Sequence, residues 1–365
     1  MSGNEFRGRA QLRQFRRLLL DWFDANARDL PWRRTSDPYA IWVSEIMLQQ
    51  TRVNAVLDHY ASFMTRFPTI EALAHAEEPE VLAIWSGLGY YRRARMLHKA
   101  AQVVVAELSA QIPEDAESLR KLPGIGEYTS AAIASIAFGE PVAVVDGNVE
   151  RVIRRLKAME STSRDKTVRE TAQTLLNADR PGDFNQAMME LGATICLPKN
   201  PLCLECPVQE LCATRGEHPT TPRQKMQSKP VHFALLERKS RKGCIEILLE
   251  QRPHNASLMA GMWELPHLDI AAAAPERLVL SLRHSITITN YQVSILRFAP
   301  EEERLLPKHK TRKWTKSEAL SSLPLTGLAR KTLKRLGLFT ASSSMIPPAK
   351  TPAVTPKLLF PASDL

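Results

Sequence analysis

Residues 122–129 read Leu-Pro-Gly-Ile-Gly-Glu-Tyr-Thr and open an apolar run that leads to Val-Asp-Gly-Asn at 145–148. A glycine turn that enters a helix directly leaves backbone N–H groups free at the positive end of the helix dipole, where a phosphate can bind. Glycine suits such a turn because it adopts positive φ without strain. The stretch predicts a phosphate-binding hairpin at Gly124 and Gly126, followed by the carboxylate of Asp146.

The composition of the chain favours a polyanionic partner. Its 365 residues carry a formal net charge of +10, and each phosphate that a basic side chain neutralises releases counterions. The length suits two domains. No run of about 18 apolar residues could span a bilayer, and residues 1–15 lack the apolar segment of a secretory signal. We therefore expect a cytoplasmic protein with no membrane partner.

Four of the five cysteines form one tight group with the spacing C-x6-C-x2-C-x5-C. Clustered thiols in a reducing compartment are more often metal ligands than disulfides. A single loop with one central C-x2-C favours an iron–sulfur cluster, whereas structural zinc usually takes two separated C-x2-C pairs. Zinc and unligated core thiols remain alternatives, and the distant Cys244 is expected to be a small buried hydrophobe. The predicted ligands are Cys196, Cys203, Cys206 and Cys212.

Apolar periodicity predicts a helical N-terminal half and a C-terminal part built from strands. The expected helices are 39–49, 53–67, 79–85, 92–108, 127–138, 148–156 and 166–176. The expected strands are 232–237, 245–250, 285–289 and 292–298. These elements divide the chain into a domain over 1–218, which includes the cysteine loop 196–212, and a second domain over 231–340. A polar, basic linker is expected over 219–230 and a disordered tail over 341–365.

Two acids stand in contrasting surroundings. Glu45 shares a helical face with the apolar Ile41, Trp42 and Leu48, and burial there raises the pKa of a carboxyl toward the value that a general acid needs. A helix glutamate paired with an arginine is the commoner explanation of such a pattern. Asp146 could simply cap the following helix. A buried acid and a second acid in a polar turn nevertheless form the pattern by which carboxylates divide the work of glycosidic cleavage.

The hairpin, the Val-Asp-Gly-Asn turn and the cysteine loop, in this order, resemble the helix-hairpin-helix DNA glycosylases of the endonuclease III superfamily. Trp32-Arg33, residues 42–51, the Gly-Leu-Gly-Tyr-Tyr of 87–91 and the additional C-terminal domain resemble its adenine DNA glycosylase branch. The resemblance covers residues 10–335. It implies a mainly α helix-hairpin-helix module with a 4Fe–4S cluster loop and a C-terminal α+β Nudix-like domain.

The resemblance implies hydrolysis of the N-glycosidic bond of adenine opposite 8-oxoguanine or guanine, after the base has left the duplex stack. Glu45 would protonate adenine N7, and Asp146 would stabilise the oxocarbenium-like sugar, with or without a transient covalent adduct. Tyr128 and Asn148 would orient the sugar and the acids. Bifunctional relatives carry a lysine nucleophile where this chain has Tyr128, so the chain is expected to remove the base without cutting the strand.

The resemblance also assigns contacts with the base and the DNA. Arg33 and Trp32 are expected to line the adenine pocket. Gln50 and Tyr90 are expected to wedge into the stack beside the estranged base, which offsets part of the unstacking cost. From the residues alone, Trp32 and Tyr90 could be core side chains and Gln50 a surface amide. The remaining expected DNA contacts are Thr51, Leu88, Gly124 and Gly126.

The C-terminal domain resembles the Nudix-like domain with which this branch senses 8-oxoguanine. Gly-Met-Trp-Glu-Leu-Pro at 261–266 matches its opening, but no Arg-Glu-x-x-Glu-Glu helix follows, so pyrophosphate hydrolysis is not expected. The recognition loop departs from the frequent Phe-Ser-His and reads Ile-Thr-Ile at 286–288. Reading of the lesion is therefore expected from His284, Ser285 or Thr287.

The expected partner is double-stranded DNA with adenine opposite 8-oxoguanine or guanine, bound by a monomer in a bacterial-type cytoplasm and associated with the nucleoid. Two other classes of function stay open. A thymine- or uracil-directed mismatch glycosylase of the same superfamily can also have tyrosine at position 128, but would not need Glu45 or the recognition domain. A non-catalytic DNA-binding metal protein would keep the hairpin and the cysteines and make both acids dispensable.

Overall fold

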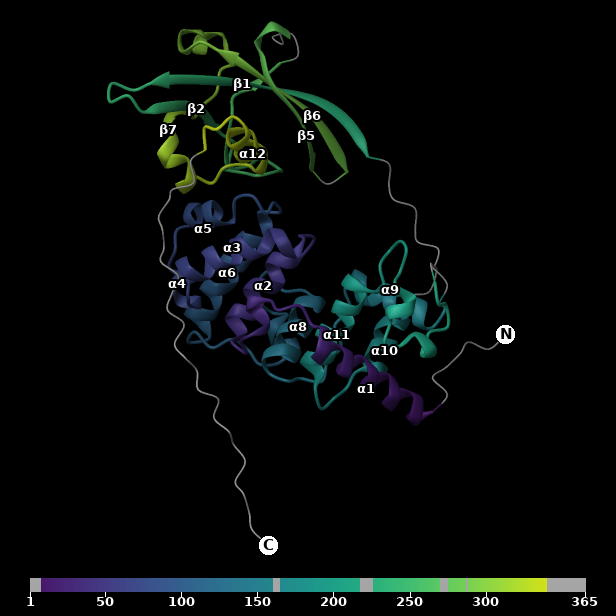
Figure 1. Cartoon of the computed structure of the whole chain (residues 1–365). Coiled ribbons are helices and arrows are strands. Elements are labelled where there is room, and N and C mark those ends of the chain that lie inside the picture. Colours follow the sequence, from purple (N-terminus) through teal and green to yellow (C-terminus); the bar gives the residue numbers. More distant parts are fainter. Residues whose placement is uncertain (1–7, 160–164, 217–225, 270–274, 287, 340–365) are drawn as a thin grey trace.

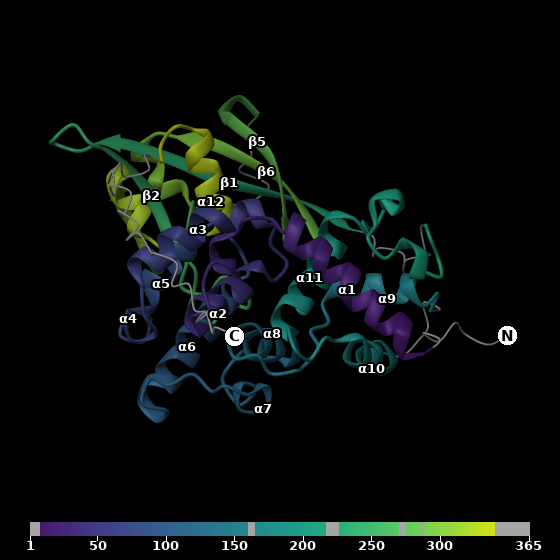
Figure 2. The same cartoon turned by 60° about the horizontal axis from the view of Figure 1, so that its bottom comes forward.

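The computed structural model describes residues 8–159, 165–216, 226–269, 275–286 and 288–339. The predicted tail and most of the predicted linker lie outside these residues, as does Thr287. Figures 1 and 2 show a helical module beside a smaller domain built around a β-sheet. None of the helices within the described ranges has the length and apolar character needed to cross a membrane.

The helical module contains two groups of helices, each with its own core. The first group surrounds Trp42, Phe63 and Trp85, all fully buried. It consists of α2 (Pro38–Leu48), α3 (Val53–Arg66), α4 (Ile70–Ala74), α5 (Glu78–Trp85), α6 (Arg92–Glu107), α7 (Ala116–Leu119) and α8 (Glu127–Ala137). The second group packs on Phe15 and Phe184. It consists of α1 (Arg9–Asn26), α9 (Gly147–Leu156), α10 (Asp165–Leu175) and α11 (Pro181–Thr194).

Each predicted helix is confirmed with boundaries within one residue of those observed. Local capping explains part of this agreement. Asp37 accepts a hydrogen bond from the Tyr39 backbone N–H at 3.0 Å, and Pro38 occupies the first turn of α2. Periodicity did not single out α1, α4, α7, α11 or the C-terminal α12 (Gly327–Arg335).

The C-terminal domain is α+β, as predicted. Its strands are β1 (Gln227–Lys239), β2 (Ile245–Gln251), β3 (Trp263–Glu264), β4 (His267–Leu268), β5 (Leu278–Ile286), β6 (Thr289–Phe298) and β7 (Arg312–Lys316). They form a mixed sheet in the order β3-β2-β1-β6-β5, in which β1 and β6 are parallel, while β4 pairs with β1 and β7 with β2. Residues of β1 alternate between two cores: Phe233 and Leu235 face α12, and Ala234 and Leu236 face the other side.

Two boundaries in this domain were predicted wrongly. β1 already begins at Gln227, inside the expected linker. Its first four residues pair with β6 but are exposed, and three of them are polar, so they looked like linker. The strand expected over 285–289 is not one strand: β5 ends at Ile286 and β6 begins at Thr289. A polar or apolar pattern reports which side chains are buried, so it cannot locate the end of a strand that projects into solvent.

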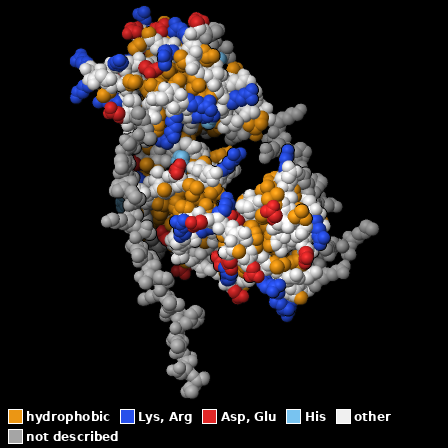
Figure 3. Space-filling view, in the orientation of Figure 1, with side chains coloured by type: hydrophobic (Ala, Val, Ile, Leu, Met, Phe, Trp, Pro, Cys, Tyr) orange, Lys and Arg blue, Asp and Glu red, His pale blue; other side chains and the backbone are white. Residues whose placement is uncertain are grey.

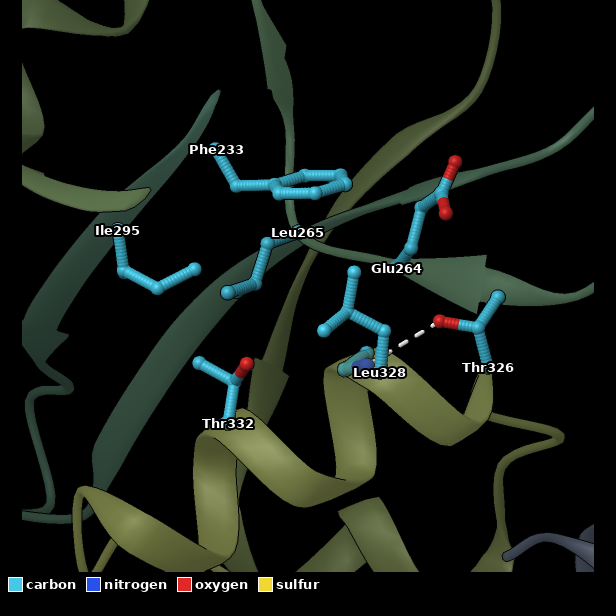
Figure 4. A pocket seen from close by; sticks show the side chains of 8 residues that line it. Phe233, Glu264, Leu265, Ile295, Thr326, Leu328 and Thr332 are labelled. Carbon is cyan, nitrogen blue, oxygen red and sulfur yellow. Dashed lines mark hydrogen bonds between the residues drawn. The ribbon is translucent and has the colours of Figure 1, made fainter. Parts of the chain in front are cut away.

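The two domains are in direct contact. Met262, from the C-terminal domain, belongs to the first helical core, and Arg95 donates from Nη2 to the Ala260 carbonyl at 2.6 Å. Figure 4 shows a pocket between the sheet and α12, with Phe233 and Ile295 on the sheet side and Thr332 on α12. It is lined by Phe233, Glu264, Leu265, Ile295, Thr326, Leu328, Ala329 and Thr332. These side chains leave almost no space for a bound molecule in this pocket.

Candidate active site and cluster loop

The hairpin presents an open turn at the start of α8. Gly124 has φ +76, and a Cβ there would lie 2.4 Å from the Met96 Cβ, so only glycine fits. Gly126 has φ −95 and open space around it, so the prediction that its conformation requires glycine is wrong. It is the N-cap of α8 and supplies no capping side chain. The first-turn N–H groups of α8 are thus left to an external acceptor such as a phosphate.

Glu45 is a buried acid. It lies on α2, only 5% exposed, and the Tyr128 hydroxyl donates to its Oε2 at 2.6 Å. Burial raises the pKa of Glu45 to about 7, although the hydrogen bond from Tyr128 acts in the opposite direction. The charge of Asp146 also contributes to this raised pKa, and the charge of Arg33 opposes it. A large fraction of Glu45 is therefore protonated at neutral pH, ready to donate a proton.

Asp146 is held in one orientation at the start of α9. Its Oδ1 accepts from the backbone N–H groups of Asn148 at 2.9 Å and Val149 at 2.7 Å, and its Oδ2 accepts from the Asn148 side-chain amide at 2.9 Å. Asn148 in turn accepts from Arg151 Nη2 at 2.9 Å. A Cβ at Gly192 would lie 2.6 Å from the Asn148 Cβ, so glycine at 192 lets α11 approach this turn closely. Asp146 is thus both a helix cap and a preorganised carboxylate.

A buried ion triad beside Glu45 was missed by sequence reasoning. Glu190 on α11 is 1% exposed and accepts from Arg28 at 2.6 and 2.7 Å and from Arg33 at 2.9 Å. Burial alone would raise the pKa of Glu190, but the hydrogen bonds and charges of the two arginines hold it at about 2. Like Glu45, Glu190 is an acid within a largely apolar helix. This pattern is the one local feature of the sequence that could have indicated Glu190. The triad fixes Arg33 next to the acid site.

Replacing Glu190 with alanine should lower the free energy of unfolding by about 3–5 kcal/mol, because it leaves Arg33, whose side chain is only 14% exposed, without its ion-pair partner. We expect a value at the lower end of that range, because the Arg28 side chain is 39% exposed and water can solvate it after Glu190 is removed. Chemical denaturation followed by circular dichroism measures it. The matched control is Asp24→Ala, which breaks the exposed pair with Arg180 and should cost at most about 1 kcal/mol. Equal effects of the two substitutions would contradict a buried triad.

Arg93 contacts both of the loops that carry the expected wedge residues. Gln50 (φ +55) and Tyr90 (φ +48) are exposed, each at a strained backbone position. Arg93, from α6, donates to the carbonyls of Ile46, Met47, Gln49 and Gly89 and to the Thr51 hydroxyl. Its guanidinium also lies 5.2 Å from the centre of the Tyr90 ring. Arg93, which the sequence did not single out, therefore binds together the two loops that carry Gln50 and Tyr90.

The remaining expected contacts divide between core and surface. Trp32 is 6% exposed and packs edge-on against Tyr60 at 5.2 Å, and Leu88 is 7% exposed, so the structure places both mainly in the helical core. His284 and Ser285 lie on β5 of the other domain. Burial lowers the pKa of His284, and Ser285 is hydrogen-bonded to the Asn290 side chain at 2.5 Å. The structure therefore brings together Glu45, Asp146, Tyr128, Asn148 and Arg33, but leaves His284 and Ser285 in a separate domain.

The cysteine loop folds against the second helical core. It contains the short helices η2 (Cys203–Glu205) and η3 (Gln209–Leu211), and three of its four thiols pack on that core. Burial, and to a smaller extent the charges of the three neighbouring thiols, raise the pKa of Cys206 to about 11. Arg155, 2% exposed, donates to the Cys196 Sγ at 3.4 Å and to the Leu197 and Pro198 carbonyls.

This arrangement fits a metal cluster. Four thiols in one short loop supply the soft ligands that iron–sulfur clusters take, and the buried Arg155 beside Cys196 can offset the negative charge of the thiolates. Within the described ranges, no three His, Cys, Asp or Glu side chains are close enough to hold one metal ion.

Comparisons with known proteins agree with both parts of this site. Residues 43–178 match the family model of the HhH-GPD superfamily base excision DNA repair proteins, and residues 196–212 match the iron–sulfur binding domain of endonuclease III. The second match begins and ends at the outer two of the four cysteines. The predicted cofactor, a 4Fe–4S cluster, is thereby confirmed.

Alignments with curated adenine DNA glycosylases extend beyond the helical module into the C-terminal domain. The human adenine DNA glycosylase is 41% identical over 321 residues, which cover 72% of this chain and 58% of the human protein. The adenine DNA glycosylase of Schizosaccharomyces pombe is 32% identical over 324 residues, with 71% and 70% covered. The chain thus spans less than two thirds of the human protein.

Solved structures share the fold of the helical module. A thermostable thymine-DNA glycosylase is 32% identical, with a TM-score of 0.52, and covers 56% of this chain and 96% of its own. An endonuclease III–DNA covalent intermediate is 23% identical, with a TM-score of 0.50, and covers 57% of this chain and 97% of its own.

Fold, hairpin and cysteine loop together define a DNA repair protein of the helix-hairpin-helix base excision class. Within that class, the alignment with the Schizosaccharomyces pombe adenine DNA glycosylase, at 32% identity over 70% of that protein, identifies the family. The chain belongs to the adenine DNA glycosylase family.

Proposed function

We propose that this chain is a monofunctional DNA glycosylase that hydrolyses the N-glycosidic bond of adenine opposite 8-oxoguanine or guanine. The observation that carries the proposal is the pair of acids. Glu45 is buried with its pKa raised to about 7, and Asp146 is held by three N–H donors close enough for its charge to act on Glu45. A general acid beside a fixed carboxylate is the arrangement that cleavage of a glycosidic bond requires.

In the proposed reaction the proton of Glu45 passes to adenine N7. The C1′–N9 bond then breaks and its electron pair stays with the base, which leaves positive charge on the sugar. Asp146 stabilises that charge, and a water molecule adds at C1′ through its oxygen, while the proton that this water loses returns to the carboxylate of Glu45. Tyr128 donates to Glu45 rather than attacking the sugar, and it carries no amine to form a Schiff base. The strand is therefore left intact at an abasic site.

DNA binding is proposed to involve both domains. Figure 3 shows lysine and arginine side chains on both sides of the hollow between them. In that arrangement, the hairpin at Gly124 and Gly126 binds a phosphate, and Gln50 and Tyr90 enter the stack. His284, Ser285 and Thr287 of the Nudix-like domain are the proposed readers of 8-oxoguanine. When bound, the iron–sulfur cluster cross-links the cysteine loop. We also propose that the chain acts as a monomer in a bacterial-type cytoplasm.

The test is a base-release assay on a panel of duplexes with adenine, thymine or uracil opposite 8-oxoguanine or guanine. The expected product is free adenine, fastest opposite 8-oxoguanine, with the strand unbroken until alkali is added. Release of thymine or uracil would make the chain a pyrimidine-directed glycosylase. Binding without release of any base would leave a DNA-binding metal protein. Strand cleavage without alkali would overturn the monofunctional assignment.

A further inference from the structure

The loop that carries Tyr90 is tied to the C-terminal domain by two buried hydrogen bonds. Ser86 Oγ donates to the Leu325 carbonyl at 2.8 Å, and the Tyr91 hydroxyl donates to the same oxygen at 3.1 Å. Ser86 is fully buried, Tyr91 is 5% exposed and Leu325 is fully buried. One carbonyl of one domain thus binds residues on both sides of the exposed wedge candidate in the other.

Further hydrogen bonds within the loop connect Tyr91 and Trp85 to the backbone next to Tyr90. The Tyr91 oxygen also accepts from the Gly87 N–H at 3.4 Å, and Gly87 has φ +114. Trp85 Nε1 donates to the Gly89 carbonyl at 3.1 Å, which Arg93 also contacts. These contacts fix the backbone up to the residue before Tyr90, and so they join the Leu325 carbonyl to the position of the Tyr90 loop.

Within the C-terminal domain, Leu325 lies next to β3 and α12, and α12 contacts β5, which carries the expected lesion readers His284 and Ser285. The backbone of Trp263 exchanges hydrogen bonds at 2.9 Å with the residues on either side of Leu325. Gly327, at the start of α12, lies between the two domains: a Cβ there would be 3.8 Å from the Tyr91 hydroxyl and 4.0 Å from His284 Cε1. Lys331, also on α12, donates to the Arg283 carbonyl of β5 at 2.9 Å. A continuous set of contacts therefore joins β5, α12, Leu325 and the Tyr90 loop.

We propose that Ser86 and Tyr91 are positioning residues that couple the base opposite adenine to the placement of the Tyr90 wedge. A base read at β5 shifts α12 and the Leu325 carbonyl, and the two hydroxyl groups transmit that shift to the Tyr90 loop. The inference rests on the proposed function, because it assigns these residues a part in substrate discrimination. If the hydroxyl groups only joined the domains, their loss would lower stability without changing the preference between substrates.

The experiment compares Tyr91→Phe and the double variant Ser86→Ala/Tyr91→Phe with the wild type. Single-turnover rates of adenine release are measured opposite 8-oxoguanine and opposite guanine. Allosteric couplings commonly amount to about 5-fold to 150-fold, so the ratio of the two rates should fall at least about 5-fold in the double variant and less in Tyr91→Phe. The matched control is Tyr39→Phe, which removes a buried tyrosine hydroxyl bond to the Phe67 carbonyl, at 2.9 Å, within the helical module alone.

A ratio that stays at the wild-type value in folded Tyr91→Phe and double variants would overturn the inference, as would an equal fall in Tyr39→Phe. If the double variant does not fold, Tyr91→Phe decides by the same ratio. Absence of adenine release by the wild type would instead refute the proposed function, and the coupling with it. The two failures are distinct, since only the second removes wild-type activity.

Discussion

Replacing Glu45 with glutamine should slow adenine release about 10²–10⁴-fold and leave DNA binding unchanged. Glutamine has the shape of glutamate, and its carbonyl oxygen can still accept the hydrogen bond from Tyr128, so the packing of α2 is kept. It cannot donate a proton to the base at neutral pH. Single-turnover release and gel-shift affinity measure the two quantities separately. Full activity of Glu45→Gln would refute its role as the general acid.

The pH profile supplies an independent check on the same residue. The protonated form of Glu45 is the active one, so the rate should be highest below about pH 7 and fall as the pH rises through the pKa. The charges that face Glu45 are Arg33, which lowers this pKa, and Asp146, which raises it. Glu264, in the C-terminal domain, also has its pKa raised by burial to about 7. The fall in rate should therefore persist in Glu264→Gln and vanish from the residual activity of Glu45→Gln.

Local patterns in the sequence were sufficient to predict most of the helical module. Apolar spacing and caps such as Asp37 act within a few residues, and these fixed the helix boundaries to within one residue. The two explanations offered for Asp146, a cap or a catalytic carboxylate, proved compatible. Its Oδ1 caps α9, while the Asn148 amide holds Oδ2. A short polar turn can serve both purposes because one carboxylate accepts several hydrogen bonds.

Contacts between distant residues could not be predicted in this way. Glu190 meets Arg33 from 157 residues away, and Ser86 meets Leu325 from 239 residues away. No periodicity in one segment records which charge or carbonyl of another segment will face it. Arg93 was overlooked for the same reason: in sequence it is one arginine among several on α6, and only the fold shows that it binds the loops of Gln50 and Tyr90.

The cysteine loop buries little apolar surface of its own, so we expect its order to depend on the bound cluster. Within residues 196–212, all of which the structure describes, Val208 alone is fully buried, while Leu204 is 92% exposed. The helices of the loop are single 3₁₀ turns. Such a segment cannot offset the entropy of ordering its backbone by apolar burial. We therefore expect the free energy of cluster binding to hold the loop against the second helical core.

Cys212→Ser should therefore lose most of the bound iron, lower the midpoint of thermal unfolding, and reduce adenine release at least about 10-fold. The thiol that it removes packs on the second helical core and lies 3.6 Å from the Arg155 carbonyl, so its loss opens the loop beside α9, whose first turn holds Asp146.

The matched control is Cys244→Ser. Cys244 is half-buried, not buried as predicted, and lies in the β1–β2 hairpin of the other domain, so its replacement should change none of these quantities. Iron content by mass spectrometry, together with the unfolding midpoint, distinguishes the outcomes: a Cys212→Ser protein with full iron would remove Cys212 from the ligand set, and stoichiometric zinc in the wild type would replace the cluster by a single-ion site.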